Sequence, residues 1–311
     1  STNQEGVYIN GWSTGIVLNN LQITAIDKEG ISIKNDIGTL EIKNSSITAK
    51  EGLKADDRIN GIKLSNVVIE ATDTGIEFKK DLNNHVEFSD VEITANNGDG
   101  ITFDAVINGG ITIDSLEITA SKKGLNFKKD VYNNFSIANT TINSVEEGII
   151  IEGKETNPVI TNSSITSSEK DAVLTKAKNW TNFTLKNSCL TANKSGSYAL
   201  QIDINKLNSD SEISNNCFYA SSSQDLAKVK GDTAGEQFDG NYWDGHSGNY
   251  TENKVNDTNP LASCNNSCEN GSSCEASYNG ILTPLEFEGK TFTIKSTYAQ
   301  SEFTQVDFEA P

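Results

Sequence analysis

The stretch GIEFKKD, residues 75–81, returns almost unchanged as GLNFKKD, residues 124–130. Their glycines lie 49 residues apart, and between them GITFDAV, from Gly100, keeps the apolar positions but replaces the lysines. Aligning the chain on this glycine, or on an apolar residue in its place, gives a unit of 22 to 27 residues. The units begin at Gly6, Gly30, Gly52, Gly75, Gly100, Gly124, Gly148, Ala172, Ala199 and Leu226. The sequence therefore predicts a fold built by repetition.

Each unit carries two further phrases. The second, such as LEIKN at 40–44 or FTLKN at 183–187, alternates apolar and polar residues and ends on Asn or Asp. The third, such as SSITA at 45–49, places Ile or Leu two residues before Ala or Ser. Alternation with a period of two and no helical period predicts three short β-strands per unit, each with one buried face.

The three phrases recur in register over residues 6–230. This pattern resembles the right-handed parallel β-helix of secreted or surface bacterial proteins with the pectate-lyase-like fold. The resemblance implies an all-β fold of about ten coils with three strands in each coil. We expect the β-helix over 1–237, a Cys-rich cap region over 238–277, and a C-terminal β-strand tail or the start of a further domain over 278–311. Residues 285–296 and 302–310 are predicted strands in that tail.

The Asn or Asp that ends the second phrase fits a corner of each coil. Asparagine tolerates the left-handed backbone region, and its amide can hydrogen-bond along a stack of similar turns. The predicted ladder comprises Asn20, Asn44, Asn66, Asp90, Asn139, Asn162, Asn187 and Asn215, with Ser115 as its weak rung. Because we expect these side chains to be buried, we interpret the glycosylation sequons at Asn44, Asn139 and Asn162 as coincidental and favour Asn249 and Asn256, which lie in a loop.

A column of charged residues follows the glycine by four positions. It reads Lys34, Asp56, Lys79, Asp104, Lys128, Glu152, Lys176, Asp203 and Lys230, after Asn10 in the first unit. The sign alternates at each step, so each lysine would lie about 4.8 Å from the acids on either side. We interpret this charge ladder as a feature that opposes a slip of one coil. A binding strip for a polymer or for Ca²⁺ is the alternative; Ca²⁺ is the one cofactor left open, and no metal-ligand set is predicted.

The strongest candidate for chemistry is KADDR, with Lys54, Asp56, Asp57 and Arg58 beside Glu77 on the next rung. Parallel β-helix enzymes that act on polysaccharides are similar in using clustered aspartates on an exposed sheet, with Arg or Lys as the base in lyases. Paired carboxylates could hydrolyse a glycosidic bond, and a base beside a neutralised uronate could eliminate it. No longer lyase or hydrolase motif accompanies these residues, so we assign no catalytic residue and retain the five as candidates.

The repeat breaks down after Leu226, and the NYW phrase resembles the end of many secreted β-helix repeat proteins. Tyr242, Trp243 and Tyr250 are predicted either to cap the last coil or to form a platform for stacking sugars. Five cysteines lie in this half of the chain. We expect disulfides between Cys189 and Cys217, on adjacent rungs, and between two of Cys264, Cys268 and Cys274.

Composition limits the partners. The net charge is −18 and Arg58 is the only arginine, which excludes recognition of a nucleic-acid backbone. No run of 18 apolar residues is present, so we expect no membrane insertion in this segment. Disulfides indicate an oxidising compartment, which places the chain outside the cell or on its surface.

These observations favour a non-catalytic extracellular or cell-surface module for adhesion, spacing or self-assembly. Its expected partner is another copy or another surface protein, with a glycan as a further candidate. The first coil has an uncovered edge, which predicts head-to-tail assembly through the coil ends. The alternatives are a polysaccharide lyase or glycoside hydrolase, and a glycan binder similar to phage tailspikes.

Overall fold

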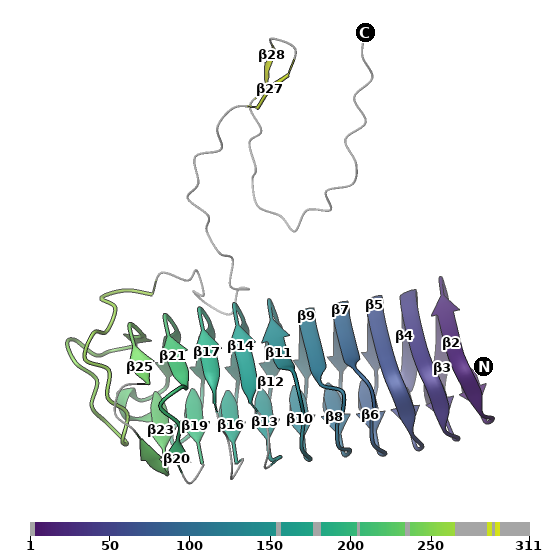
Figure 1. Cartoon of the computed structure of the whole chain (residues 1–311), viewed down its shortest axis with the longest axis horizontal. Helices are drawn as coiled ribbons and strands as arrows, with labels where there is room; N and C mark the ends of the chain where they lie inside the picture. The colour runs from purple at the N-terminus through teal and green to yellow at the C-terminus, as the bar shows by residue number, and fades with distance from the viewer. Residues whose placement is uncertain are drawn as a thin grey trace. The chain divides into compact units, whose positions relative to one another are not determined.

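The protein is described by a computed structural model that covers residues 4–153, 157–176, 182–203, 206–233, 237–264, 285–287 and 290–292. The chain divides into two compact units, Ser1–Ala276 and Ser277–Pro311. The first unit is a parallel β-solenoid of about nine turns, and its one short helix among the described residues is a 3₁₀ turn at Ser223–Asp225 (Figure 1). The predicted all-β parallel β-helix is therefore confirmed. The ten glycine-aligned units each contribute one strand to the first face. Nine successive pairings join these ten strands, which corresponds to about nine turns.

Each turn contributes a strand to three faces. The first face contains β1 (Val7–Ile9), the ends of β3 (Gln22–Ile33) and β4 (Ile37–Ala55), then β6 (Ile76–Phe78), β8 (Ile101–Phe103), β10 (Leu125–Phe127), β13 (Ile149–Ile151), β16 (Val173–Thr175), β19 (Leu200–Ile202) and β23 (Ala227–Val229). The second face contains β2 (Ser13–Asn19), the start of β4, the first halves of β5 (Ile59–Ala71), β7 (Val86–Ala95) and β9 (Ile111–Ala120), then β11 (Phe135–Ala138), β14 (Pro158–Thr161), β17 (Thr184–Lys186), β21 (Glu212–Ser214) and β25 (Phe238–Asp239). The third face contains the start of β3, the middle of β4, the second halves of β5, β7 and β9, then β12 (Thr141–Ser144), β15 (Ser164–Ser167), β18 (Cys189–Ala192), β22 (Cys217–Ala220) and β26 (Tyr242–Trp243).

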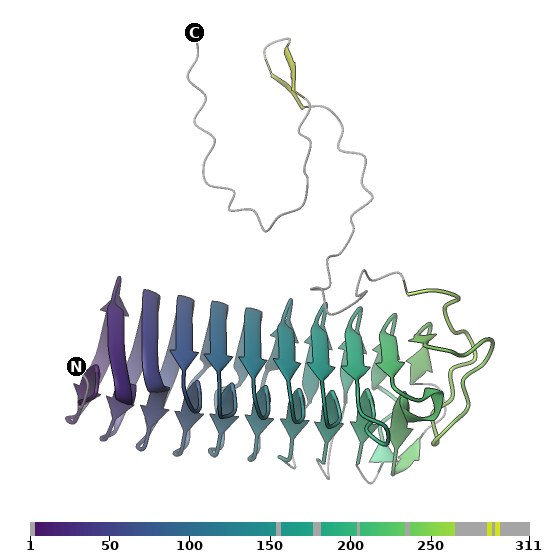
Figure 2. The ribbon, with the colours of Figure 1, turned by 180° about the vertical axis from the view of Figure 1, so that it is seen from behind.

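Strands on each face pair in parallel with their counterparts one turn later. Ile76 lies opposite Ile101, and Ile101 lies opposite Leu125, so the sequence repeat and the hydrogen-bond register coincide. The turns follow one another in chain order, as both views of the ribbon show (Figures 1 and 2). A separate short pair, β20 (Lys206–Leu207) with β24 (Asp232–Thr233), lies outside the main sheet.

The interior is a stack of apolar side chains. Ile47, Ile69 and Ile93 on the third face are fully buried, and the rings of Phe78, Phe103 and Phe127 on the first face stack at 5.3 and 4.8 Å. Burial of such side chains contributes about 1.5–3 kcal/mol each, which makes this stack the main source of stability.

The recurring glycine is required by a close approach to the third face. A Cβ atom added at Gly124 would lie 2.3 Å from Cγ2 of Ile142 and 2.5 Å from the carbonyl oxygen of Gly148. No side chain fits into that space without displacing the backbone of the next turn. Glycine therefore recurs at this position because of close packing, and not because a turn requires it.

The corner between the second and third faces has the left-handed backbone that the asparagines predict. All eight ladder residues, and Ser115, have φ between 49° and 56°. The side chains, however, point outward and are exposed, so the expectation that they are buried is wrong. A corner residue turns its side chain away from the solenoid, and burial therefore gives no reason to dismiss the sequons at Asn44, Asn139 and Asn162.

A line of buried polar residues runs along the second half of the solenoid to its C-terminal end: Thr140, Ser163, Ser188, Asn216, Asn241 and Asp257. Along this buried polar line, the backbone N–H of each of the first five donates to the side-chain oxygen of the next, at 2.9–3.2 Å. Asp257 ends the line and also accepts from Nε1 of Trp243 at 2.9 Å. The buried N–H groups of the last rung are thus hydrogen-bonded by Asp257, in the loop that follows the rung.

The second compact unit contains an antiparallel pair, β27 (Leu285–Phe287) with β28 (Lys290–Phe292). Both strands fall within the strand region predicted at 285–296. The strand predicted at 302–310 lies outside the described residues, as does the whole of the region 265–284.

Candidate functional site

The KADDR residues lie on one rung, where the first face turns toward the second, and their charged partners lie on the same rung and on the two adjacent rungs. Nζ of Lys54 lies 2.6 Å from Glu51, 3.7 Å from Glu77 and 3.9 Å from Glu29. Burial alone would lower the pKa of Lys54, but the hydrogen bond to Glu51 and the charges of these carboxylates outweigh burial and raise it. A lysine held protonated by three acids is a poor general base.

Asp56 lies between two lysines of the charge ladder, Lys34 and Lys79, and forms ion pairs with both. Burial alone would raise the pKa of the Asp56 carboxyl, but the hydrogen bonds and charges of the two lysines outweigh burial and lower it. A carboxylate stabilised in its charged form is unsuited to act as a general acid.

The remaining candidates are dispersed. Arg58 lies in an exposed pair with Asp36, with 3.6 Å between Nη1 and Oδ2, and Asp57 is partly exposed at the bend beside it. Glu77 reaches Lys54 at 3.7 Å and Lys79 at 3.5 Å. The structure brings Lys54, Asp56 and Glu77 together, but as one network of ion pairs rather than around an open position for a substrate.

Farther along the charge ladder, each acid is paired with one lysine. Ion pairs join Lys128 to Asp104 at 2.7 Å, Lys176 to Glu152 at 3.0 Å, and Lys230 to Asp203 at 2.8 Å. Each ladder residue from Lys34 onward also donates its backbone N–H to a carbonyl of the preceding turn. The backbone hydrogen bonds along the column are therefore continuous, and each acid of the column is paired with at least one lysine.

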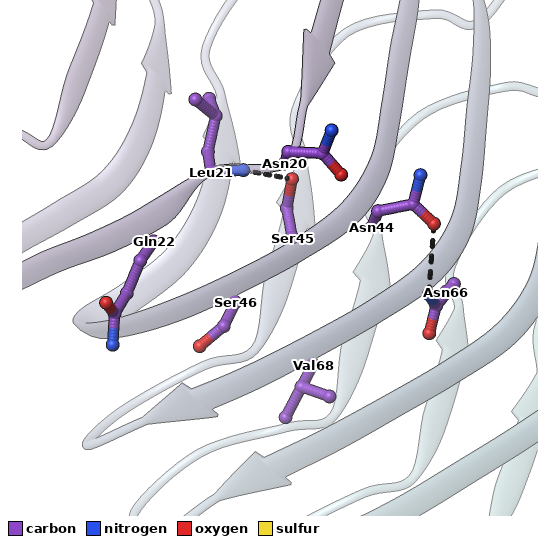
Figure 3. Close-up of a pocket in the computed structure, with 8 residues that line it drawn as sticks. All are labelled: Asn20, Leu21, Gln22, Asn44, Ser45, Ser46, Asn66 and Val68. Atoms are coloured by element: carbon purple, nitrogen blue, oxygen red, sulfur yellow. Dashed lines mark hydrogen bonds between the residues drawn. The ribbon is translucent and has the colours of Figure 1, made fainter.

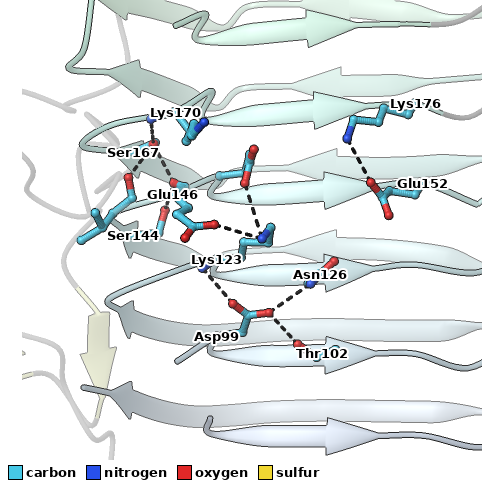
Figure 4. Close-up of polar contacts among 12 residues, drawn as sticks. Asp99, Thr102, Lys123, Asn126, Ser144, Glu146, Glu152, Ser167, Lys170 and Lys176 are labelled. Carbon is cyan, nitrogen blue, oxygen red and sulfur yellow. Dashed lines mark hydrogen bonds and ion pairs between the residues drawn. The ribbon is translucent and has the colours of Figure 1, made fainter. Parts of the chain in front are cut away.

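A second polar column, at the residue just before each glycine, was missed in the sequence. Asp99 accepts hydrogen bonds from Oγ1 of Thr102 at 2.8 Å, Nδ2 of Asn126 at 3.0 Å and the backbone N–H of Lys123 at 3.2 Å (Figure 4). Nζ of Lys123 lies 3.0 Å from Glu146 in the next turn. The sequence contains a pattern that predicts this column, because acidic residues precede the glycine in several units, at Glu29, Glu51, Asp99 and Glu147.

Asp171 belongs to the same column and differs from the others. Burial raises the pKa of its carboxyl, the N–H of Tyr198 at 2.7 Å opposes this, and the negative charge of Glu147 adds to the rise. Such a shift occurs at catalytic acids and also at structural turns. The Asp171 carboxyl is held by the backbone N–H of Tyr198 in the next turn, so we interpret the shift as structural.

The aromatic residues at the C-terminal end are a cap. Trp243 and Tyr250 are buried, with their rings stacked at 4.0 Å, and Trp243 also stacks on Phe218 at 4.6 Å. Buried rings cannot stack on a sugar, so the prediction that Trp243 and Tyr250 bind a ligand is wrong. Tyr242 is partly exposed and packs against Tyr219 at 5.8 Å.

The cysteines form a clamp on the outer side of the third face. Cys217 is bonded to Cys264, with Cα atoms 5.6 Å apart. Cys189 lies opposite Cys217 as expected, and the three sulfurs lie within 4.8 Å of one another. Cys264 is therefore a partner of Cys217 that the sequence did not predict, and a bond between Cys268 and Cys274 stays a prediction. Cys268 and Cys274 lie outside the described residues.

One shallow depression, of about 370 Å³, lies over the corner of the first three turns (Figure 3). It is lined by Asn20, Leu21, Gln22, Asn44, Ser45, Ser46, Asn66 and Val68. Two hydrogen bonds cross it, from the N–H of Leu21 to Oγ of Ser45 at 3.1 Å and from Nδ2 of Asn66 to Oδ1 of Asn44 at 3.0 Å. Its lining has no titratable group, so it offers binding by amides and hydroxyls but no acid–base chemistry.

No protein-family model, no curated protein and no solved structure matches this chain. The class that the fold defines is therefore a parallel β-solenoid, and the pectate-lyase-like type remains a prediction. Within the described ranges, no helix is long and apolar enough to cross a membrane.

Proposed function

We propose that the protein is a non-catalytic extracellular or cell-surface module that acts as a rigid spacer or adhesion scaffold. The observation that carries the proposal is the pairing of the candidate catalytic groups. Lys54, Asp56 and Glu77 are held in one ion-pair network across adjacent turns, and the other acids of the column are each paired with one lysine as far as Lys230. An enzyme site interrupts such regularity.

The rod itself supports a spacing role. Ten rungs at about 4.8 Å make a solenoid of roughly 45–50 Å. Its parallel strands are hydrogen-bonded along the whole length, and Trp243 and Tyr250 cover the C-terminal end. The Cys217–Cys264 disulfide supports an oxidising location outside the cytosol.

The test is a screen for turnover and for retention. The chain is incubated with acidic and neutral polysaccharides, with and without Ca²⁺, and new unsaturated uronates and new reducing ends are measured. We expect neither product, and any reproducible turnover would contradict the proposal. Retention on immobilised glycans without turnover would instead favour a glycan-binding scaffold.

A matched pair of variants locates any activity that the screen detects. Asp56→Asn changes the KADDR network, whereas Asp203→Asn changes the same column six rungs away, where only Lys230 is paired with it. Loss of turnover in Asp56→Asn alone would revive the polysaccharide lyase or hydrolase alternative.

A further inference from the structure

Three cysteines that are far apart in the sequence lie together on the outer side of the third face. Cys189 and Cys217 are 28 residues apart, and Cys217 and Cys264 are 47 residues apart, so no zinc-type spacing predicts that they meet. The fold brings their sulfurs within 4.8 Å of one another. Three thiolates spread evenly around one metal ion, at bond lengths of about 2.3 Å, lie about 4 Å apart. The cluster therefore has the size of a three-sulfur metal site.

The strands fix the positions of two of the sulfurs. Cys189 in β18 and Cys217 in β22 lie opposite each other in register. Their backbone N–H groups donate to the carbonyl oxygens of Ser163 and Ser188, each at 2.8 Å. Because these bonds belong to the backbone, breaking a disulfide leaves the two cysteines side by side.

The third sulfur comes from the loop that follows the last turn. The N–H of Leu261, three residues before Cys264, donates to the carbonyl oxygen of Asn241 at 2.9 Å. The carboxylate of Asp257 joins the same loop to Trp243. These hydrogen bonds keep the loop against the solenoid, so Cys264 stays near the other two cysteines when its disulfide is broken.

The cluster is shielded from water on one side and accessible on the other. Cys189 is 1% exposed and Cys217 is fully buried, with the rings of Tyr219 and Tyr242 packed against them. Cys264 is partly exposed. Burial in apolar surroundings disfavours a bare thiolate, so three buried thiolates need a cation among them. The partly exposed side of Cys264 provides the route by which an ion enters.

The ligand set favours monovalent copper. Thiolates select Cu(I) and Zn²⁺ over the harder divalent ions. Structural zinc almost always has four protein ligands. Among the described residues, by contrast, the group consists of three sulfurs, with no imidazole or carboxylate beside them. Cu(I) is stable with three ligands, so it fits this site better than Zn²⁺.

We propose that Cys189, Cys217 and Cys264 bind one Cu(I) ion when the chain is reduced. All three cysteines are disulfide-bonded in the structure, Cys217 with Cys264, so the disulfide and the metal are alternative links between the last turns and the loop. A phosphine opens each S–S bond with one water: phosphorus takes the water oxygen and loses two electrons, and the two sulfurs take those electrons and the two protons. Cu(I) then replaces the three thiol protons, which are released.

The test uses the full 311-residue chain, reduced with a phosphine under argon and titrated with Cu(I) in competition with a chromophoric chelator. We expect the first equivalent of Cu(I) to bind, X-ray absorption to count three sulfur ligands around it, and the melting temperature of the reduced chain to rise. Failure to take the first equivalent from the chelator, oxygen ligands in the first shell, or tighter binding of Zn²⁺ than of Cu(I) would each overturn the proposal.

A matched pair of variants locates the site. Cys189→Ser removes one sulfur of the cluster, whereas Cys274→Ser removes a cysteine outside it, so both variants keep four thiols. We expect Cys189→Ser to raise the dissociation constant for Cu(I) at least tenfold, because even a partner behind a ligand changes metal affinity by about 10–100-fold. Cys274→Ser should leave the dissociation constant unchanged. Equal effects of the two substitutions would overturn the assignment of the ligands.

Equal melting temperatures of the two reduced, copper-free variants establish that both fold. If Cys189→Ser does not fold, the count of sulfur ligands in the parent chain decides the question alone. The result is separable from the proposed spacer function. A chain that binds no copper and turns over no glycan leaves the spacer standing, and glycan turnover by a copper-binding chain leaves the metal site standing.

Discussion

At the scale of single residues, the charge ladder places opposite charges on neighbouring turns. Asp104 is an example, because it lies between Lys79 and Lys128 in the column and pairs with Lys128 at 2.7 Å. An exposed pair of this kind contributes about 0–1 kcal/mol. The individual energies are small, but a slip of one turn would place lysine beside lysine along the entire column.

Asp104→Lys tests that reading. The substitution removes one pair and places three lysines in succession, so we expect the free energy of unfolding to fall by about 1 kcal/mol at low salt. High salt should reduce the difference. Chemical denaturation at two ionic strengths measures it, with Asp104→Asn as the control that removes the pair without adding repulsion. If the denaturation midpoint at low salt is the same in the variant and the parent, the charge ladder does not contribute to stability.

Asp171 gives a pH prediction at the same scale. Its folded-state pKa is raised, so between the ordinary value of an aspartate and the raised value the folded protein binds more protons than the unfolded chain. The free energy of unfolding therefore falls as pH increases through that window. Asp171→Asn keeps an oxygen acceptor for the N–H of Tyr198 and removes the charge. We expect the variant to melt higher than the parent at neutral pH and equally below the window; a lower melting temperature at neutral pH would contradict this.

At the scale of the element, one glycine determines how closely two faces pack. Gly124→Ala would place Cβ 2.3 Å from Cγ2 of Ile142, and we expect a loss of about 2–3 kcal/mol of stability. Gly61→Ala is the matched control, because its Cβ would meet nothing closer than 3.4 Å. Thermal unfolding of both variants compares them. Similar losses of stability in the two variants would mean that Gly124 is needed for its backbone conformation and not because a Cβ atom has no room there.

The cap gives the second prediction at this scale. Oδ2 of Asp257 accepts from the N–H of Asn241, from Nδ2 of Asn241 and from Nε1 of Trp243, and Oδ1 accepts from the N–H of Asn259. Asp257→Ala leaves buried donors without acceptors, each of which costs about 1–3 kcal/mol, so we expect a loss of at least about 3 kcal/mol. Asp239→Ala, at an exposed residue of β25, should cost little. Denaturant unfolding decides between them.

The sequence predicted the elements where the repeat holds and failed where it ends. Gly, Ile and Asn recur because each turn solves the same packing problem, so their columns predicted rungs, strands and left-handed corners. The partner of Cys217 and the acceptor role of Asp257 come from an irregular loop, and no periodic pattern encodes them. The direction of the corner asparagines was also mispredicted, because tolerance of a positive φ says nothing about which way the side chain points.

At the scale of the whole molecule, the two ends of the solenoid differ. At the C-terminal end, Trp243 and Tyr250 are buried and Cys217 is bonded to Cys264, whereas Trp12 and Val17 in the first turn are exposed. The sequence identified the residues of the candidate site but not their ion-pair partners. Only the geometry shows that Lys54 is surrounded by acids and that Asp56 lies between lysines.

The buried polar line has a consequence for how the molecule comes apart. Each turn contacts only its neighbours, so opening of the solenoid must begin at an end and travel inward. The line from Thr140 to Asp257 fastens the last turns together, whereas one bond of this kind, from the N–H of Leu21 to Oγ of Ser45, joins the first two turns. Protection of backbone amides against hydrogen exchange should therefore rise along the chain from β2 toward β18, measured at a concentration that keeps the chain monomeric. Uniform protection would mean that the solenoid unfolds as one cooperative unit. Protection that rises along the chain would mean that the solenoid opens turn by turn from its N-terminal turns.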